Sequence, residues 1–323
     1  MHIRPILVAL VVGTSVLALL GCACCDRSLA NEDAPRGAFE NVGTRATPLR
    51  LWVEERGRGE PIVMLHGFGA SMYTWRYVAP ALARTHRVIT VDLKGSGRSD
   101  KPFDDKYRVI DQVALLKRLI DHRGLTDLTL IGHSFGGGVA LALALDLNET
   151  RPAALKQLIL IDSIAYRQRL PLFIRLLQAP VLAQIGMYAV LPEIVSYEGI
   201  YAAYHDPSKI TLDAVRAYAL PLYEPGGRYA LLKTAEEIIP ANLSALIERY
   251  PTIHQPVEII WCTEDPIVPL WVGRKLARNL PDAHLSVLRS CGHVPQEELP
   301  RQTLSIMRKF LRQGRRMGPA VRS

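Results

Sequence analysis

One serine of this 323-residue sequence, Ser134, stands where its hydroxyl could act as a nucleophile. It is the centre of a Gly-x-Ser-x-Gly pattern, after the apolar residues 128–131 and before an Ala/Leu-rich segment with the composition of a buried helix. A sharp turn between a strand and a helix strains the backbone at the serine and exposes its side chain, and small neighbours let the two elements approach. We therefore expect Ser134 to be a nucleophile; a structural Gly-rich turn is the alternative.

A second glycine-bearing loop, residues 66–69, follows the short apolar run 61–65. Such a loop at the end of a central strand can aim a backbone N–H into a pocket, where it stabilises the oxyanion that develops during acyl transfer. We expect the N–H groups of Phe68 and Phe135 to be these donors. His66 and His133 are more consistent with structural hydrogen bonds than with the role of a catalytic base.

The elements that must position these residues alternate between strands and helices. Strands are expected at 49–55, 61–65, 86–91, 128–131, 155–162, 257–262 and 285–288, and helices at 75–83, 109–123 and 299–311 in addition to the one after Ser134. This alternation predicts a mostly parallel sheet with right-handed crossovers. Residues 92–102 are rich in turn formers but lack the spacing of a phosphate-binding loop, and we interpret them as structural.

Three blocks of the sequence, in chain order, resemble a known superfamily. HGFGAS, DLKGSGRSDKP and GHSFGG together resemble the α/β-hydrolase superfamily, in the branch that holds epoxide hydrolases, haloalkane dehalogenases, C–C bond hydrolases, haloperoxidase-like enzymes and small esterases. The resemblance implies the α/β-hydrolase fold, with a sheet of about eight strands, a helical cap after the sixth strand, and the chain order nucleophile, acid, histidine. Dehalogenases and epoxide hydrolases of this branch use an aspartate nucleophile, so Ser134 argues against both activities.

The same resemblance suggests the acid and the base. Residues 261–269 match the acid block of the family, although Cys262 stands where glycine is usual, and the aspartate of that block is Asp265. Its role would be to fix the histidine tautomer and to stabilise the imidazolium. Asp162, at the end of an earlier strand, is the alternative acid. His293 lies in a Gly-His-x-Pro turn after the last strand and is the expected general base.

Residues 163–251 differ in composition from the rest of the chain, with scattered prolines, several tyrosines and no clear strand pattern. The family resemblance suggests a helical cap over the active site here, between core segments 48–162 and 252–313, with a basic tail at 314–323. The apolar residues of this expected cap would favour an apolar substrate if they line the active site; alternatively, they pack only against the domain. Examples are Leu172, Phe173, Leu176, Leu177, Met187 and Tyr188.

Composition argues against several classes of partner. The net charge of +8 could suggest an anionic partner, but no dense basic patch with interleaved aromatic residues is present, so nucleic-acid binding is not expected. The cysteines lack zinc spacing and the histidines are scattered, so we expect no metal and no cofactor. Cys262 and Cys291 follow neighbouring strands near the expected triad, and the sequence leaves open whether they form a disulfide.

The N-terminus has the features of an export signal. Residues 6–20 are apolar but too few to span a bilayer, so a secretory signal is more consistent than a membrane helix. The residues LLGC that end at Cys22 resemble the lipobox of bacterial lipoproteins. The resemblance implies a signal peptide at 1–21, acylation of Cys22 and a tether over 22–47, which would anchor the protein to a membrane of the bacterial cell envelope. An ordinary signal is the alternative.

These features predict an exported serine hydrolase that cleaves a carboxylic ester or similar acyl bond of a small apolar substrate. C–C bond hydrolysis of a diketone uses the same triad and is the enzyme alternative, although Phe135 stands where those enzymes more often carry methionine. A catalytically silent ligand-binding protein on the same fold is the alternative from another class. The presence of the nucleophile, acid and histidine motifs together counts against the ligand-binding alternative.

Overall fold

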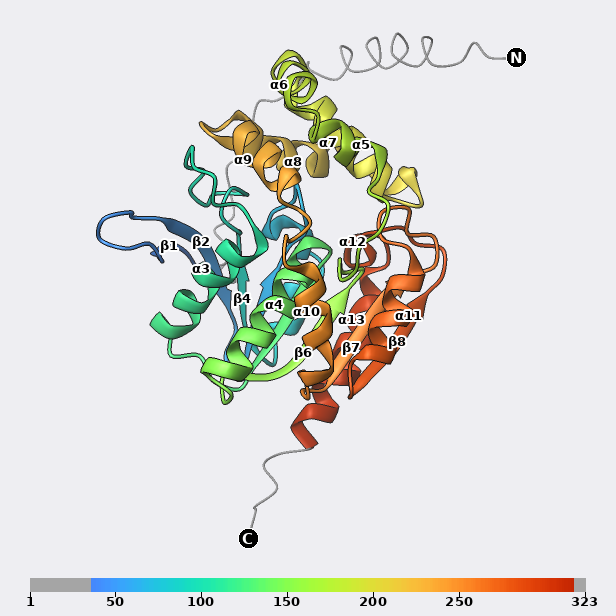
Figure 1. Ribbon diagram of the computed structural model, residues 1–323. Helices are drawn as coiled ribbons and strands as arrows, with labels where there is room; N and C mark the ends of the chain where they lie inside the picture. The colour runs from blue at the N-terminus through green and yellow to red at the C-terminus, as the bar shows by residue number, and fades with distance from the viewer. Residues whose placement is uncertain (1–35, 317–323) are drawn as a thin grey trace, which may run out of the picture. The chain divides into compact units, whose positions relative to one another are not determined.

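The computed structural model describes residues 36–316, whose strands form one eight-stranded sheet in the order β1-β2-β4-β3-β5-β6-β7-β8 (Figure 1). The strands are β1 (Arg36–Asn41), β2 (Arg50–Arg56), β3 (Pro61–Leu65), β4 (Arg87–Val91), β5 (Leu128–His133), β6 (Leu155–Ile161), β7 (Val257–Cys262) and β8 (Ala283–Leu288). β2 pairs antiparallel with both β1 and β4, and every other pairing is parallel. The predicted mostly parallel sheet is therefore confirmed.

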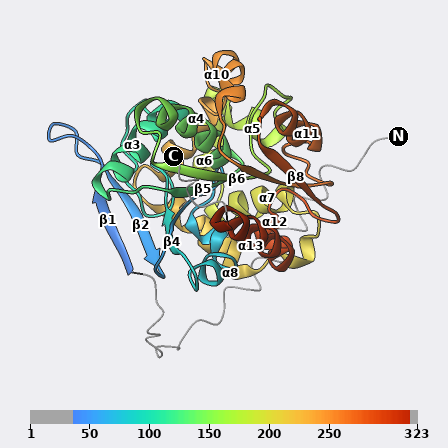
Figure 2. The same ribbon diagram turned by 90° about the horizontal axis from the view of Figure 1, so that it is seen from below.

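Helices cover both faces of the sheet because the central strands are apolar on both sides. In β3, Val63 and Leu65 belong to one buried cluster, whereas Ile62 and Met64 belong to another. The first cluster includes α3 (Val109–His122), α4 (Phe135–Thr150) and α11 (Leu270–Asn279), and the second includes α2 (Ala79–Leu82) and α13 (Pro300–Arg316). Figure 2 shows α3 and α4 on one side of the sheet and α13 on the other.

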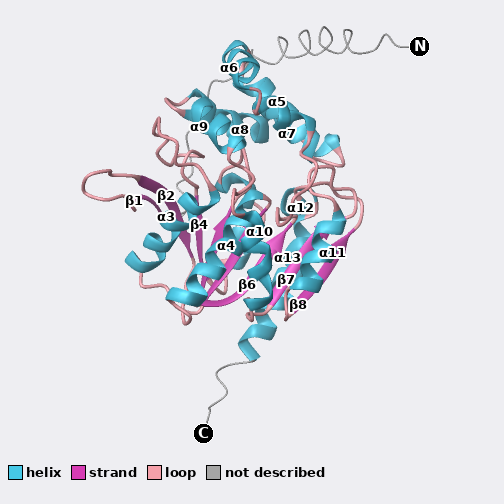
Figure 3. Ribbon diagram, viewed as in Figure 1, coloured by secondary structure: helices cyan, strands magenta, loops and turns pink. Residues whose placement is uncertain are grey.

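The chain between β6 and β7 is helical, as the sequence predicts. It contains α5 (Leu172–Leu177), α6 (Pro180–Ala189), α7 (Pro192–Ala203), η2 (Pro207–Lys209), α8 (Leu212–Tyr223), α9 (Gly227–Glu236), α10 (Leu243–Arg249) and η3 (Tyr250–Thr252). Helices α5–α9 lie beyond the carboxyl ends of the parallel strands, and we call them the cap (Figure 3). By contrast, α10 packs on the core through Leu246 and Ile247.

The structure differs from the sequence-based expectation at the start of the domain. Part of the expected tether forms the edge strand β1. In this strand Phe39 pairs with Trp52 of β2, and the centroids of their rings are 4.9 Å apart. The side chain of Phe39 is exposed, so no apolar run marks the strand, which is held by backbone pairing with β2. The expected helix at 75–83 is instead a short 3-10 helix, η1 (Met72–Trp75), followed by α2.

Residues 1–35 and 317–323 lie outside the described part of the chain. The expected signal peptide, Cys22 and most of the tether fall there, as does most of the basic tail. Within residues 36–316, no helix combines the length and the hydropathy needed to cross a membrane.

Candidate active site

Ser134 occupies a strained turn between β5 and α4. Its backbone has φ +52° and ψ −117°, a conformation that costs energy for any residue with a side chain. The strand and the helix approach so closely that a Cβ on Gly132 would lie 2.5 Å from the carbonyl oxygen of Gly136. The turn therefore has the geometry that the Gly-x-Ser-x-Gly pattern demands, with the serine hydroxyl at the carboxyl edge of the sheet.

Three of the predicted site residues lie in one hydrogen-bonded line. The hydroxyl of Ser134 donates to Nε2 of His293 at 2.7 Å, and Nδ1–H of His293 donates to Oδ2 of Asp265 at 2.8 Å. The other carboxylate oxygen of Asp265 accepts from the N–H groups of Ile267 and Val268, at 2.7 and 2.9 Å. The carboxylate is thus fixed, and it selects the imidazole tautomer whose Nε2 is free to accept the serine proton.

The alternative acid, Asp162, is also close but has a different environment. It is fully buried at the end of β6, and its Oδ1 accepts from the N–H of Cys262 at 3.0 Å. Burial, together with the nearby charge of Asp265, holds the pKa of Asp162 well above its usual range. A triad acid must be ionised, so this environment favours Asp265 for that role.

Two further histidines adjoin the site and make structural hydrogen bonds. Nε2 of His66 accepts from the N–H of Leu93 at 3.0 Å, its Nδ1–H donates to the carbonyl of Gly67 at 2.8 Å, and burial lowers its pKa to about 4. Nε2–H of His133 donates to the carbonyl of His293 at 2.7 Å. Burial, then the proximity of His293, lowers the pKa of His133 well below the usual value. Both rings are held neutral and support the loops around them.

The two expected oxyanion donors face the same cavity as Ser134. Phe68 lies in the loop after β3, and Phe135 is the first residue of α4, where a helix N–H has no intrahelical partner. No acceptor within residues 36–316 takes a hydrogen bond from either N–H. Both groups are therefore available to an oxygen atom of a bound substrate.

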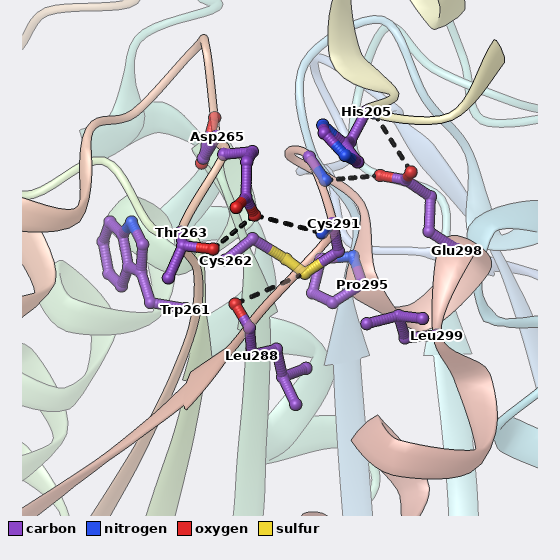
Figure 4. Close-up of a disulfide and its surroundings, with 12 residues drawn as sticks. His205, Trp261, Cys262, Thr263, Asp265, Leu288, Cys291, Pro295, Glu298 and Leu299 are labelled. Carbon is purple, nitrogen blue, oxygen red and sulfur yellow. Dashed lines mark hydrogen bonds between the residues drawn. A yellow bond between two sulfur atoms is a disulfide. The ribbon is translucent and has the colours of Figure 1, made fainter.

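A disulfide joins the loops that carry the acid and the histidine. Cys262 is the last residue of β7, Cys291 follows β8, and their Cα atoms are 5.4 Å apart (Figure 4). Glu264 adds a second link, because its Oε2 accepts from the N–H of Cys291 at 3.3 Å. The pairing that the sequence left open is thus present, and it lies directly beside Asp265 and His293.

The sequence analysis missed a buried carboxylate that joins the cap to the core. Glu297, in α12 (Pro295–Glu298), forms an ion pair with Arg76 at 2.6 Å and accepts from the hydroxyl of Thr74 at 2.6 Å. From the cap, the hydroxyl of Tyr204 donates to it at 2.9 Å, and the hydroxyl of Tyr218 donates as well. The available signal was a pair of adjacent glutamates that begins two residues after the proline of the Gly-His-x-Pro turn.

The neighbouring Glu298 and the backbone N–H of His293 bind the chain at the C-terminal end of α7. Oε2 of Glu298 accepts from the N–H of His205 at 3.0 Å, and its Oε1 accepts from Gly292 at 2.7 Å (Figure 4). The N–H of His293 donates to the carbonyl of Ala203 at 2.6 Å. The C-terminal end of α7 is therefore fixed to the loop that positions His293.

A cavity of about 360 Å³ separates the cap from the loops that carry Ser134 and His293. Most side chains between residues 170 and 238 that line it are apolar: Leu170, Phe173, Ile174, Leu176, Leu177, Val195, Ile200, Leu222, Leu231 and Ile238. Three of the six cap residues that were expected to line the cavity do not line it. Leu172 and Tyr188 are exposed, and Met187 packs against Ala183 within the cap. Side chains on opposite sides of one helix cannot both face the cavity, and only part of the apolar surface of α5 and α6 does so.

Besides the histidines, the charged side chains among the described lining residues are those of Glu198 and Lys94, and the ammonium is already paired. Lys94 lines the cavity, but its Nζ donates to Asp104 at 2.6 Å and to the carbonyl of Lys106 at 2.8 Å. Among the described residues, no group of His, Cys, Asp and Glu side chains has an arrangement that could hold a metal ion. The walls therefore suit an uncharged, largely apolar ligand.

Comparison with known proteins identifies the family. A family model described as "alpha/beta hydrolase fold" matches residues 60–300. The chain belongs to the α/β-hydrolase fold family. Its predicted fold class is thereby confirmed, and the crystal structure of Cfl2 from Burkholderia cenocepacia has the same fold, with a TM-score of 0.72 at 24% identity over 85% of this chain and 95% of that one.

Curated relatives of this α/β-hydrolase include enzymes that are named for a defined substrate. The 2-hydroxymuconate semialdehyde hydrolase of a Pseudomonas species is 28% identical over 82% of this chain and 92% of its own length. An uncharacterised protein of Mycobacterium tuberculosis is 27% identical over 79% of this chain and 76% of its own.

Proposed function

We propose that this α/β-hydrolase is a serine hydrolase that cleaves a carboxylic ester or similar acyl bond of a small apolar substrate. The observation that carries the proposal is the hydrogen-bonded line from Ser134 through His293 to Asp265. In the proposed mechanism, His293 takes the proton of Ser134 as the hydroxyl attacks the acyl carbon, and it gives that proton to the leaving alcohol. A water molecule, deprotonated by the same histidine, then attacks the acyl-enzyme, and the histidine returns the proton to Ser134 as the carboxylic acid leaves. Asp265 holds the tautomer, and the N–H groups of Phe68 and Phe135 stabilise the oxyanion.

The cavity supports an uncharged acyl group as the substrate. The apolar cap residues would surround an alkyl or aryl chain, and the paired Lys94 leaves no free cation among the described lining residues to bind a carboxylate. C–C bond hydrolysis is the second candidate, and the 2-hydroxymuconate semialdehyde hydrolase relative is the observation that favours it. We rank it second because described walls that contain the Glu198 carboxylate and no free cation offer little to an anionic substrate.

Substitution of Ser134 by alanine tests the nucleophile. We expect Ser134→Ala to lower turnover of acyl esters about a million-fold and to abolish labelling by a fluorophosphonate, because the attacking oxygen is gone. Ser196→Ala is the matched control: this serine lines the same cavity but has no histidine partner within the described residues, so labelling should persist. Full labelling of Ser134→Ala would overturn the assignment.

A panel of substrates separates the candidate functions. Neutral acyl esters of increasing chain length should be turned over, with a preference for chains that fill the cavity, and a vinylogous diketone that carries a carboxylate should not. Preference for the diketone would move the assignment to C–C hydrolysis. A chain that binds these compounds without turnover or labelling would be a ligand-binding protein.

The expected export signal and the anchor at Cys22 belong to the same proposal, because they would place this enzyme at a membrane of the cell envelope. Their support is the sequence pattern before the described domain.

A further inference from the structure

Helix α6 of the cap is apolar on two opposite faces, and only one of them is covered. Ala183 and Met187 are buried against α9. Val181, Ile185 and Tyr188, spaced so that they share the other side of the helix, are 71, 63 and 61% exposed. A helix that is apolar all round is normally buried on all sides, in a protein core or in lipid. The outer side of α6 therefore lacks the cover that its composition requires.

Exposed apolar side chains also occur on α5, which packs beside α6 in the cap (Figure 1). Leu172 and Leu176 are 66 and 49% exposed. We call the surface formed by Leu172, Leu176, Val181, Ile185 and Tyr188 the cap face. Several exposed apolar side chains on two neighbouring helices are typical of an interaction site.

The segment of the chain that carries the cap face has charges of one sign. Between Asp162 and Glu193 the sequence contains three arginines and no carboxylate. Arg167, Arg169 and Arg175 are all exposed, and none of them forms an ion pair with a carboxylate in the described part of the chain. Exposed apolar residues and exposed arginines along one helical segment are typical of helices that lie in the interface of an anionic membrane.

Other occupants fit this charge pattern less well. A second copy of the chain, bound through the same surface about a two-fold axis, would place the arginines of the two copies near each other. The apolar residues 6–20 of this chain contain no carboxylate to pair with the arginines. Phosphate headgroups satisfy the arginines, and the acyl region beneath them covers the apolar side chains.

We propose that the cap face docks this protein onto the surface of an anionic lipid bilayer. In this pose the exposed side of α6 enters the acyl boundary and the arginines contact headgroup phosphates. Leu176 belongs both to the cap face and to the cavity lining, so an apolar ester can pass from the bilayer to the cavity along α5. The docking stands without the proposed hydrolase activity, but the delivery of an ester rests on it.

A local readout is needed, because another part of the chain could also bind membranes. The full chain carrying Ile185→Trp is mixed with phosphatidylcholine vesicles that contain phosphatidylglycerol and brominated acyl chains. The matched control is Ile110→Trp on α3, a site 55% exposed and outside the cap. We expect bromine to quench the tryptophan at position 185 several-fold more than that at 110, because only the former enters the acyl region.

Charge and apolar contact are then tested separately. Replacement of Arg167, Arg169 and Arg175 by glutamine should raise the lipid concentration for half-maximal quenching at position 185 about a hundredfold. Ile185→Asp should slow hydrolysis of an ester embedded in vesicles at least tenfold, because it removes apolar contact with the bilayer. It should leave turnover of a water-soluble short ester unchanged, since residue 185 does not line the cavity.

Each result decides one claim. Equal quenching at positions 185 and 110, or none at 185, overturns the docking, as does self-association in light scattering that Ile185→Asp abolishes. Quenching confined to position 185 in a chain that hydrolyses no ester supports docking and rejects the proposed function. Equal sensitivity of both esters to Ile185→Asp rejects delivery from the bilayer.

Discussion

Replacing both disulfide cysteines with alanine should lower the free energy of unfolding by about 4 kcal/mol. The bond between Cys262 and Cys291 joins residues 29 positions apart. The entropy that a crosslink of this length removes from the unfolded chain corresponds to about 3.6 kcal/mol at room temperature. Loss of two fully buried sulfur atoms from the second core cluster adds to this cost. The sum is a large share of the roughly 5–15 kcal/mol that stabilises a typical domain.

Urea unfolding of the oxidised and reduced chain measures this contribution. Both cysteines are fully buried, so a phosphine reductant must be equilibrated in urea, where the loops open. We expect the reduced wild-type chain and the Cys262→Ala/Cys291→Ala chain to unfold at similar, lower urea concentrations. The double variant is also the control for the other cysteines, because reductant should leave its transition unchanged.

Turnover separates a stabilising crosslink from one that also positions the site. The disulfide adjoins the loops that hold Asp265 and His293 2.8 Å apart, and misplacement of catalytic groups by about 1 Å can cost about a hundredfold in rate. In the absence of urea, the double variant should lose at least tenfold in turnover, with a smaller change in KM. The reasoning is refuted if reductant shifts the double variant as far as the wild type, or if it shifts neither.

Three other predictions concern single residues. Asp265→Asn should lower ester turnover by about four orders of magnitude through the wrong histidine tautomer, whereas Asp162→Asn should be comparatively mild; steady-state kinetics of both variants decide this, and the reverse ranking would make Asp162 the acid. The buried His66, with a pKa of about 4 in the folded chain against 6.5 for a free histidine, should stabilise the fold above pH 6.5 and lose this contribution as the pH falls toward 4. His66→Gln should therefore remove about 3 kcal/mol of the pH dependence of unfolding between pH 7 and 4, and parallel stability curves for the two chains would contradict the assignment. Cys22→Ser should abolish acylation and signal removal while Cys24→Ser and Cys25→Ser should not; intact mass of the purified chain is the measurement, and an unacylated wild-type chain would exclude the lipoprotein proposal.

The sequence was informative wherever a local constraint leaves a local pattern. The turn at Ser134 needs glycine on both sides because strand and helix nearly touch, and those glycines are visible in the sequence. The central strands are buried on both faces, so each is an apolar run whose ends can be placed within a residue or two. For this reason the fold class was predictable from the sequence.

The features that escaped prediction depend on partners distant in the chain. Strand β1 has an exposed outer edge and is recognised only by its pairing with β2. The disulfide could not be assigned, because sequence does not contain the 5.4 Å between the Cα atoms of Cys262 and Cys291. Glu297 resembles an ordinary surface glutamate, and only the approach of Arg76 and two cap tyrosines makes it a buried group.

The attachment of α7 to the histidine loop divides the cap into two parts with different freedom to evolve. Near Ala203 and Tyr204, a substitution acts on the backbone of His293 and on Glu297, so this end is under the same constraint as the catalytic loop itself. No described hydrogen bond ties α5 or α6 to α12 or to His293. Apart from Ile174, which is buried in the first core cluster, the α5–α6 segment is therefore an exchangeable module. If the proposed function is right, grafting this segment from a relative should change which substrates the cavity accepts, whereas grafting the end of α7 should abolish turnover.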